Sequence, residues 1–205
     1  NNEAAYSGGG IYMVTGRVAN STISTNIAMN YDGGGIWFQA GEVFNCTVSR
    51  NVSRLRNGGG IYADYWMGVI SNCVISHNMA LSAGNGGGVM LRSGAIYDSL
   101  IDQNYCEPNS GGGLYLNPTT RVERCVISNN TAMGSGGGVY MSYGGWVTNS
   151  TVIDNRSTKN DGGGIYMVMG EVYDSLVKSN TARQGGGIFT YGGSTVETSR
   201  IVYNV

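Results

Sequence analysis

The sequence predicts an all-β fold, a parallel β-helix (β-solenoid) of about eight rungs with three short strands per rung. Three observations predict it: a triple glycine recurs along the whole chain, one asparagine accompanies each copy, and the apolar positions follow the spacing of strands. The triplets start at Gly8, Gly33, Gly58, Gly86, Gly111, Gly136, Gly162 and Gly185. A near-constant period of about 25 residues is typical of stacked repeats, so residues 1–205 are expected to form a single β-solenoid domain.

The composition excludes several classes of function. Glycine accounts for 35 of the 205 residues and charged residues for 12%, against ~7% and ~25% in an average protein. With a net charge of -1 and no cluster of Lys or Arg, the chain is not expected to bind nucleic acid. No apolar run reaches about 18 residues, so membrane insertion is not expected. The low charge and the many Asn, Ser, Thr and Tyr residues favour an extracellular or cell-surface location.

Three further columns follow the glycines in each repeat. An aliphatic residue is followed three positions later by Ser or Cys, and two positions after that by Ile or Val, as at Val18, Ser21 and Ile23. Positions two apart share one face of a strand, whereas a separation of three between buried positions requires a bend. Each repeat therefore divides into about three short strands joined by corners. No segment has the 3.6-residue period of a helix.

One asparagine occurs in each repeat, three positions after the second aliphatic residue. The column comprises Asn26, Asn51, Asn78, Asn104, Asn130, Asn155, Asn180 and Asn204. We interpret it as a structural Asn ladder at a corner, where asparagine tolerates an unusual backbone conformation and its amide can bond the backbone or the next Asn. The glycine triplet marks another corner, which needs either positive φ or close backbone approach.

Two of these motifs resemble the repeats of a known family. The Gly-Gly-Gly-Ile segment at residues 33–36 is similar to the GGA[IVL] repeat of polymorphic outer-membrane proteins. The Ile-Ser-Thr-Asn segment at residues 23–26 is similar to their FxxN repeat, with Ile in place of Phe. The resemblance covers essentially the whole chain. It implies a right-handed β-helix on the outside of a bacterium, with adhesion as its role.

No pattern of catalytic or metal-binding residues stands out. The outward position of the first strand carries no carboxylate, and acids such as Asp98, Asp102 and Glu171 are spread over different rungs. The single histidine, His77, has no partner at a metal-ligand spacing. We therefore expect no catalytic residue, no metal and no cofactor, and a protein that is not an enzyme. A polysaccharide-active enzyme is the alternative, because such enzymes resemble this chain in their parallel β-helix.

An outward aromatic column after the glycines is the main candidate for a binding surface. It comprises Tyr12, Trp37, Tyr62, Met90, Tyr115, Tyr140, Tyr166 and Phe189. A continuous apolar stripe of this kind marks an interaction surface. It would bind a glycan or a cell surface, as in an adhesin, or pack laterally on another copy. The alternative is a ladder of rings that stabilises the sheet through rung-to-rung contacts.

The four cysteines fall into two groups. Cys46, Cys73 and Cys125 share one buried column and are expected to be free thiols that act as small apolar residues, because in-register side chains on neighbouring rungs have poor disulfide geometry. Cys106 follows Asn104 in a loop, so it is expected to be more exposed and open to an intermolecular bond.

The leading functional hypothesis is an extracellular structural protein whose copies stack head to tail into filaments. The first and last residues show no capping pattern, and the chain is close to a whole number of rungs. Open, complementary ends favour a heterologous contact that propagates. The predicted axial interface comprises Val18, Ser21, Ile23, Val196, Ser199 and Ile201. A surface adhesin or glycan-binding module that uses the aromatic stripe is the second hypothesis.

Overall fold

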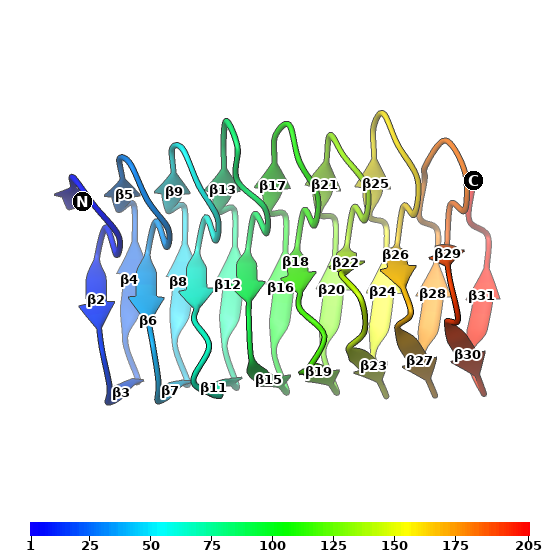
Figure 1. Cartoon of the computed structure of the whole chain (residues 1–205), viewed down its shortest axis with the longest axis horizontal. Helices are drawn as coiled ribbons and strands as arrows, with labels where there is room; N and C mark the ends of the chain where they lie inside the picture. The colour runs from blue at the N-terminus through cyan, green and yellow to red at the C-terminus, as the bar shows by residue number, and fades with distance from the viewer.

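The structure, a computed structural model, describes residues 1–205 and contains 31 β-strands and no helix. The strands wind into one elongated solenoid, and the two termini lie at its opposite ends (Figure 1). Strands pair only in parallel, each with the equivalent strand of the next turn, so the sheets run along the axis of the solenoid. With no helix present, none is long and apolar enough to cross a membrane.

Each turn contributes strands to four sheets, which we name B, C, D and A in the order in which a turn passes through them. Sheet B consists of β2 (Ile11–Met13), β6 (Ile36–Phe38), β10 (Ile61–Ala63), β14 (Val89–Leu91), β18 (Leu114–Leu116), β22 (Val139–Met141), β26 (Ile165–Val168) and β29 (Ile188–Tyr191). Sheet C consists of β3 (Arg17–Ala19), β7 (Glu42–Phe44), β11 (Gly68–Ser71), β15 (Gly94–Tyr97), β19 (Thr120–Glu123), β23 (Trp146–Thr148), β27 (Glu171–Tyr173) and β30 (Thr195–Glu197).

The other two sheets follow in the same way. Sheet D consists of β4 (Thr22–Ser24), β8 (Thr47–Ser49), β12 (Val74–Ser76), β16 (Leu100–Asp102), β20 (Val126–Ser128), β24 (Thr151–Ile153), β28 (Leu176–Lys178) and β31 (Arg200–Val202). Sheet A consists of β1 (Glu3–Ala4), β5 (Ile27–Ala28), β9 (Val52–Ser53), β13 (Met79–Ala80), β17 (Tyr105–Cys106), β21 (Thr131–Ala132) and β25 (Arg156–Ser157).

The prediction of three strands per rung is therefore wrong by one. The sequence columns account for sheets B, C and D, but the residues just after the asparagine form a fourth strand instead of a loop in the turns up to Asn155. That strand has only two residues wherever it forms, which is too short for an alternating pattern to be visible in the sequence.

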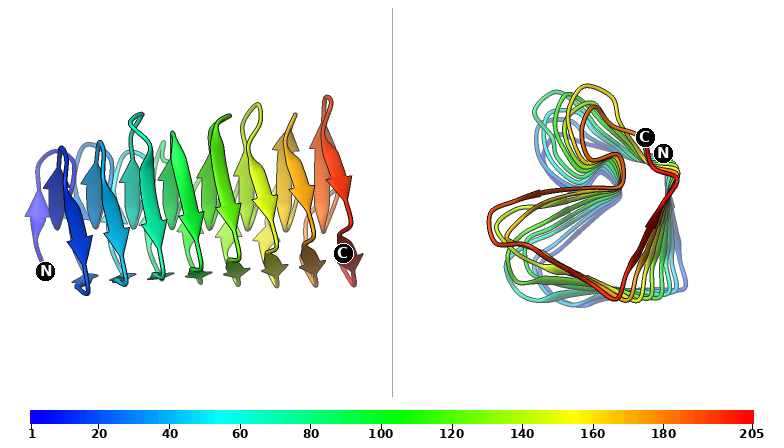
Figure 2. Two further views of the ribbon diagram at one scale, coloured as in Figure 1. Left: turned by 90° about the horizontal axis from the view of Figure 1, so that it is seen from below. Right: turned by 90° about the vertical axis from the view of Figure 1, so that its right-hand side faces the viewer.

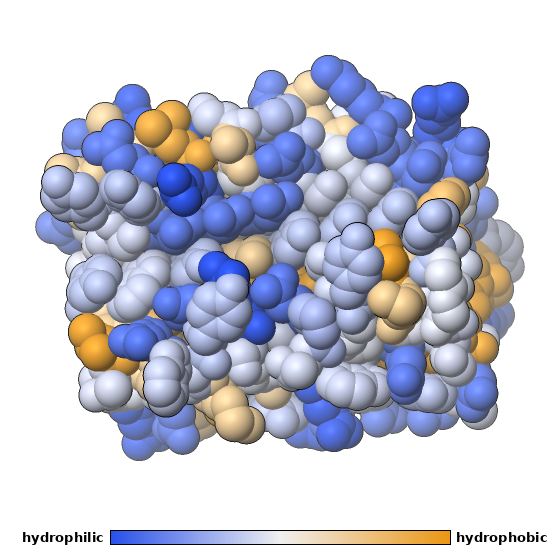
Figure 3. Space-filling model, viewed as in Figure 1, coloured by the Kyte–Doolittle hydropathy of each residue, from blue (hydrophilic) through white to orange (hydrophobic).

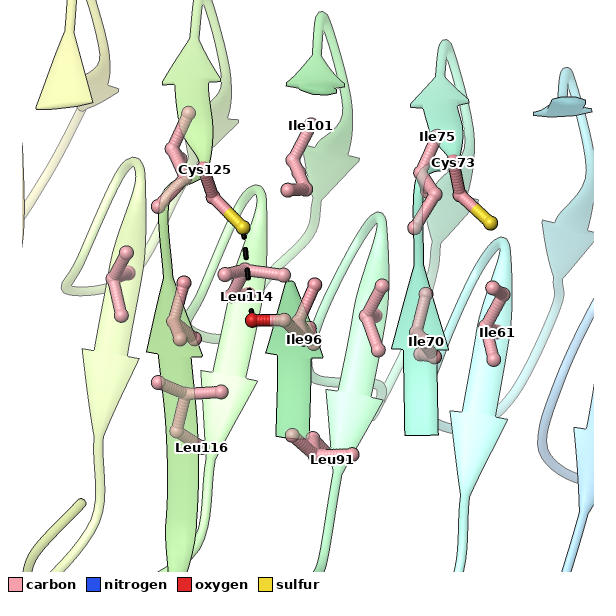
Figure 4. Close-up of a cluster of buried hydrophobic side chains, with 14 of the residues drawn as sticks. Ile61, Ile70, Cys73, Ile75, Leu91, Ile96, Ile101, Leu114, Leu116 and Cys125 are labelled. Carbon is pink, nitrogen blue, oxygen red and sulfur yellow. Dashed lines mark hydrogen bonds between the residues drawn. The ribbon is translucent and has the colours of Figure 1, made fainter. Parts of the chain in front are cut away.

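The main core lies between sheets B, C and D, and sheet A with the glycine triplets forms a smaller lobe beside it (Figure 2, right). The central residue of each strand in sheets C and D points inward, and so do the first and third residues of the sheet B strands. Together with Cys46, Cys73 and Cys125 they form one cluster of 28 buried residues along the stack. Figure 4 shows part of it, with equivalent side chains such as Ile70 and Ile96 aligned from turn to turn.

The smaller lobe is filled by small side chains. Ala80, Cys106 and Ala132 form its buried cluster, and each occupies the second position of a sheet A strand. The expectation that Cys106 is exposed is therefore wrong, because its side chain points into this lobe and no part of it reaches solvent. Its thiol donates to the carbonyl oxygens of Gly84 and Ser110, at 3.3 and 3.4 Å.

All four cysteines are free and buried, so their thiols are predicted to be unreactive in the native protein. Burial raises the pKa of Cys73 and Cys125 to about 11 and that of Cys106 to about 12, so these thiols stay protonated at neutral pH. We expect no reaction with a thiol reagent in the native protein at pH 8 and reaction of all four thiols in denaturant. Rapid labelling of Cys106 without denaturant would contradict its placement.

The raised thiol pKa values also predict a loss of stability at alkaline pH. A thiol whose pKa is higher in the folded state stabilises the protein. This contribution to the free energy of unfolding is complete below the pKa of the unfolded state, about 8.5, and is lost as pH rises through the pKa of the folded state. We therefore expect the free energy of unfolding to fall between about pH 9 and pH 11 to 12, as measured by urea titration. Replacing Cys106 by alanine is expected to reduce this fall.

Each glycine of a triplet is needed for its own reason. The first has a positive φ, which is 75° at Gly111. A Cβ atom on the second, Gly112, would lie 2.5 Å from the carbonyl carbon of Thr131 in sheet A. A Cβ on the third, Gly113, would lie 2.9 Å from the Nδ2 atom of Asn130. Positive φ is thus required at the first glycine, and close backbone approach at the second and third. At these two positions there is no room for a side chain.

The asparagine column forms a hydrogen-bonded ladder along the wall between the two lobes. Asn130 is fully buried, and its Nδ2 donates to the Ile101 carbonyl and to Asn155 Oδ1, both at 2.9 Å. Its Oδ1 accepts from the backbone N and the Nδ2 of Asn104, at 2.9 and 3.0 Å. Every donor and acceptor of this buried amide is therefore satisfied, as stability requires.

Two details of the ladder differ from the sequence interpretation. The unusual backbone conformation belongs to the preceding residue, with φ of 53° at Gln103 and 54° at Asn129, and not to the asparagine itself. The ladder also has a further member, Asn2, whose backbone N and Nδ2 donate to Asn26 Oδ1 at 3.0 and 2.8 Å. The sequence reading missed Asn2 because no glycine triplet precedes it.

Candidate functional site

The eight residues of the predicted aromatic stripe lie next to one another in the middle of sheet B. They do not form a continuous exposed surface. Tyr12 is 60% exposed, but Tyr62 and Met90 are only 5% and 7% exposed. The Tyr62 hydroxyl accepts a hydrogen bond from Arg92, whose guanidinium lies over the ring of Tyr65, 3.7 Å from its centroid. These side chains interrupt the stripe after its second turn.

The remaining rings of the stripe stack on each other. Tyr12 and Trp37 are stacked with their centroids 4.3 Å apart, and Tyr115, Tyr140, Tyr166 and Phe189 form a column with spacings of 4.8 to 5.1 Å. Interplanar angles of 4° to 15° mean that the rings face one another and leave mainly their edges to solvent. Such pairs contribute roughly 0.5–1.5 kcal/mol each. The geometry favours the stabilising ladder over the binding stripe.

Figure 3, which is viewed from the same side as Figure 1, agrees with this description. Pale and blue side chains cover most of the face, and the hydrophobic ones lie in separate small groups instead of one band.

A different surface, the outward face of sheet C, carries the combination of residues expected of a binding site. One outward column comprises Arg17, Glu42, Val69, Ala95, Arg121, Trp146, Glu171 and Thr195. The other comprises Ala19, Phe44, Ser71, Tyr97, Glu123, Thr148, Tyr173 and Glu197. Both columns flank the inward aliphatic column that begins at Val18.

A groove of ≈ 650 Å³ runs over strands β15 to β27 of this face. We call it the sheet C groove. Its apolar lining comes chiefly from Tyr97, Trp146 and Tyr173, and its polar lining from Ser93, Thr119, Arg121, Thr148 and Glu171. Met67, in the corner between β10 and β11, closes one end. A concave surface with aromatic walls and a few polar groups is the usual form of a ligand site.

Hydrogen bonds hold the polar and aromatic groups of the groove in place. The carboxylate oxygen Oε2 of Glu171 accepts from Trp146 Nε1 at 3.0 Å and from the Tyr173 hydroxyl at 2.9 Å. The bond to Glu171 raises the pKa of Tyr173, so this hydroxyl remains a donor. Arg121 is fixed by Glu123, with its guanidinium nitrogen 2.9 Å from the carboxylate.

The rings in the groove differ from those of sheet B in one respect. None of Tyr97, Trp146 and Tyr173 stacks on another aromatic ring, and the only ring contact near them is the Arg124 guanidinium, 5.8 Å from the centroid of Tyr97. Trp146 is 39% exposed although it is the largest side chain of the groove. All three rings line the groove without stacking on another ring.

The structure gathers no metal-binding group. No three side chains among its His, Cys, Asp and Glu residues come together, and His77 lies on the surface next to the ladder residue Asn78. Asp102 is instead held by hydrogen bonds from Ser128, Asn129 and Gln103, at 2.7 to 2.8 Å.

The residues of the predicted axial interface lie in the first and last turns. Ile23 is only 5% exposed, whereas Val196 and Ile201 are 37% and 44% exposed. The equivalent positions in the interior turns, such as Val122 and Ile127, are fully buried. Val18 and Ser199 are partly buried and Ser21 is exposed.

The fold and this surface define a class: an all-β parallel solenoid of about eight turns with a groove on one outward sheet face. The chain matches the family model of the right-handed β-helix region over residues 43–205. It therefore belongs to the right-handed β-helix family, which confirms the fold class predicted from the sequence. No curated protein and no solved structure matches the chain.

Sequence reasoning missed the sheet C groove because it followed only the outward position after the glycines. The residues that line the groove lie one position before and one position after the aliphatic column of sheet C that begins at Val18. Reading the positions before and after Val122, Val147 and Val172 gives the residues of the groove floor. The corner residues Met67, Ser93 and Thr119 could not be found in this way, since the lengths of those corners vary.

Proposed function

We propose that this chain is a non-catalytic glycan-binding β-solenoid that acts outside the cell and binds sugar in the sheet C groove. The observation that supports it is the set of unstacked rings, Tyr97, Trp146 and Tyr173, beside hydrogen-bonding groups in one groove. A sugar ring offers C–H groups to an aromatic face, whose π electrons are negative, and hydroxyls to neighbouring polar side chains. The resemblance of the repeats to those of polymorphic outer-membrane proteins supports a bacterial surface location.

Replacing Trp146 by alanine is expected to weaken glycan binding most. Large aromatic residues at the centre of an interface dominate binding energies, so we expect a rise in Kd of at least ~10-fold, which corresponds to about 1.4 kcal/mol. The measurement is affinity gel electrophoresis against xylan, β-glucan, mannan and polygalacturonate, followed by calorimetry with a matching oligosaccharide. Tyr97→Ala and Tyr173→Ala are expected to weaken binding in the same direction.

Two controls separate the groove from other surfaces. Tyr203 is an exposed tyrosine that follows β31, outside the groove, and Tyr203→Ala is expected to leave the Kd unchanged. Tyr140→Ala removes a ring from the sheet B column, so it is expected to lower the free energy of unfolding without affecting binding. If the wild-type protein binds none of the four polymers, the proposal is overturned. If it releases shortened products from any of them, the chain is an enzyme that acts on that polysaccharide and not a non-catalytic binding module.

A second proposal, head-to-tail assembly into filaments, draws on the direction of the asparagine ladder. Within the chain, each asparagine donates to the Oδ1 of the following one, as Asn180 donates to Asn204. The Oδ1 of Asn2 and the backbone N of Asn204 would therefore be complementary if one copy followed another. The exposed Val196 and Ile201 would be buried by the same contact.

Assembly is expected to be blocked by a charge at the axial face. Ile201→Asp places a carboxylate where Ile201 would contact the next copy, and burying it unpaired costs several kcal/mol. Leu100→Asp is the matched control, because Leu100 is similarly exposed but faces outward from sheet D. The measurements are negative-stain microscopy and sedimentation of the 205-residue chain. Discrete particles that never elongate, or filaments that Ile201→Asp leaves intact, would contradict the proposal.

A further inference from the structure

We infer that the sheet C groove is selective for an uncharged polysaccharide that lies along the solenoid axis and spans about three turns. The inference rests on the proposed glycan-binding function and adds the charge class, direction and length of the ligand. Three features support it: the charges on sheet C, the placement of the three rings and the position of Glu171.

The outward face of sheet C carries more acids than bases. Its two columns contain four glutamates, Glu42, Glu123, Glu171 and Glu197, and two arginines, Arg17 and Arg121. Both arginines are already paired within the face, Arg17 with Glu42 at 3.5 Å and Arg121 with Glu123 at 2.9 Å. No base on the face is left to neutralise a ligand carboxylate. A polyuronate would therefore meet like charge, which weakens binding.

Nearby bases outside the two columns do not change this balance. Arg124, which lies beside the groove, forms a bidentate pair with Asp98, with nitrogen–oxygen distances of 2.7 and 2.9 Å, and also contacts Glu123. Arg92, at the corner next to Ser93, donates to the hydroxyl of Tyr62 and lies over Tyr65. Arg124 thus has acidic partners within the protein, whereas Arg92 contacts a hydroxyl and a ring and its buried Nε has no hydrogen-bond partner.

The three rings fix the direction of the ligand. Tyr97 and Tyr173 belong to the same outward column, on β15 and β27, with Glu123 and Thr148 between them in register. Three strand spacings separate them, or about 14 Å along the axis. Trp146 is on β23, one turn before Tyr173, in the adjacent column. A ligand that contacts all three rings must run along the axis, and a pyranose ring is roughly as long as one strand spacing.

Glu171 sets the charge preference at the centre of the groove. Its Oε2 is occupied by Trp146 and Tyr173, and no protein group bonds its Oε1. The carboxylate is half-buried and held between two rings, so it cannot turn away from a ligand. It can accept a hydrogen bond from a sugar hydroxyl, and it repels a ligand carboxylate at the same position.

The test compares neutral and acidic oligosaccharides by calorimetry with the full chain. We expect a neutral hexasaccharide of xylose, glucose or mannose units to bind with a Kd that changes little with salt, and hexagalacturonate to bind at least ~10-fold more weakly. Along the neutral series, affinity is expected to rise from the disaccharide to the trisaccharide or tetrasaccharide and then to level off.

A variant tests the role of Glu171 separately. Glu171→Gln keeps an oxygen acceptor for Trp146 and Tyr173 and removes the charge. We expect the ratio of the Kd for hexagalacturonate to that for the neutral hexasaccharide to fall about tenfold, whatever the change in the neutral Kd itself. Glu197→Gln, at the end of the face and outside the groove lining, is the matched control and is expected to change this ratio much less.

The outcomes separate the inference from the proposed function. Equal or tighter binding of hexagalacturonate, lost in Trp146→Ala, would overturn the inference and leave the glycan-binding groove in place. A neutral ligand whose affinity does not depend on length would overturn its placement along the axis. Binding of neither class would overturn the proposed function itself.

Discussion

Replacing Gly112 by alanine is expected to destabilise the native structure severely. A Cβ atom there would lie 2.5 Å from the carbonyl carbon of Thr131 and 2.6 Å from its oxygen. These are backbone atoms of the neighbouring strand, so no side chain can turn aside to make room. The glycine corner and sheet A would have to separate locally, with loss of backbone hydrogen bonds such as that from Gly112 N to the Gly136 carbonyl. We expect a cost of about 4 kcal/mol or more, measured by urea denaturation.

Gly193→Ala is the matched control for this prediction. Gly193 lies in the corner between β29 and β30, and a Cβ atom added to it would have no heavy atom within 4 Å. The substitution is expected to change the free energy of unfolding by at most ~0.5 kcal/mol. If Gly112→Ala were as well tolerated as Gly193→Ala, the close packing of the glycine corner would be wrong.

The second large effect is expected at the asparagine ladder. Asn130→Ala removes the only acceptor of the Asn104 backbone N–H, which stays buried, and a donor to both Ile101 and Asn155. A buried polar group left without a partner costs about 1–3 kcal/mol, and a cavity adds to this. We expect a total loss on the order of 3 kcal/mol in the free energy of unfolding.

Two further variants make the asparagine prediction specific. Asn160→Ala, at an exposed loop position, is expected to change the stability by at most ~0.5 kcal/mol. Asn130→Asp places a carboxylate against two oxygens, so burial should raise the pKa of the new group. The stability of Asn130→Asp is then expected to rise as pH falls, because protonation restores one donor, whereas that of Asn130→Ala should not. If the free energy of unfolding of Asn130→Asp did not change with pH, the buried geometry of the asparagine ladder would be wrong.

The sequence carries most of the information about the fold. The glycine, aliphatic and asparagine columns each correspond to one position in every turn, because a solenoid repeats its environment from turn to turn. The path of the chain within one turn, with its fourth strand and second lobe, was harder to predict. The strand of two residues after each asparagine leaves no alternation to detect, and therefore the second lobe and the burial of Cys106 within it could not be inferred from the pattern.

The binding surface was predictable only in part. The aromatic column of sheet B is conspicuous because its residue type repeats, and repetition is what a structural ladder requires. In the sheet C groove, by contrast, Ala95, Arg121, Trp146 and Glu171 occupy one column and share no chemistry. A ligand site on a repeat protein lies where the repeats differ, so a search for regular columns leads away from it.

The asparagine ladder also makes the solenoid electrically polar. In the sheets, hydrogen bonds alternate in direction along the axis: Asn45 N donates to Ser71, and Thr47 N donates back to Ser21. In the ladder, one Nδ2 hydrogen donates back to the preceding turn, as that of Asn130 does to Ile101. The other Nδ2 hydrogen, the backbone N–H of the ladder residues and the glycine corners donate only toward the following turn, as Gly34 N does to Gly58. Their dipoles therefore add, as peptide dipoles do in a helix. The lobe wall ends in partial negative charge at Asn2 and partial positive charge beyond Asn204, so the two ends should attract ions of opposite sign.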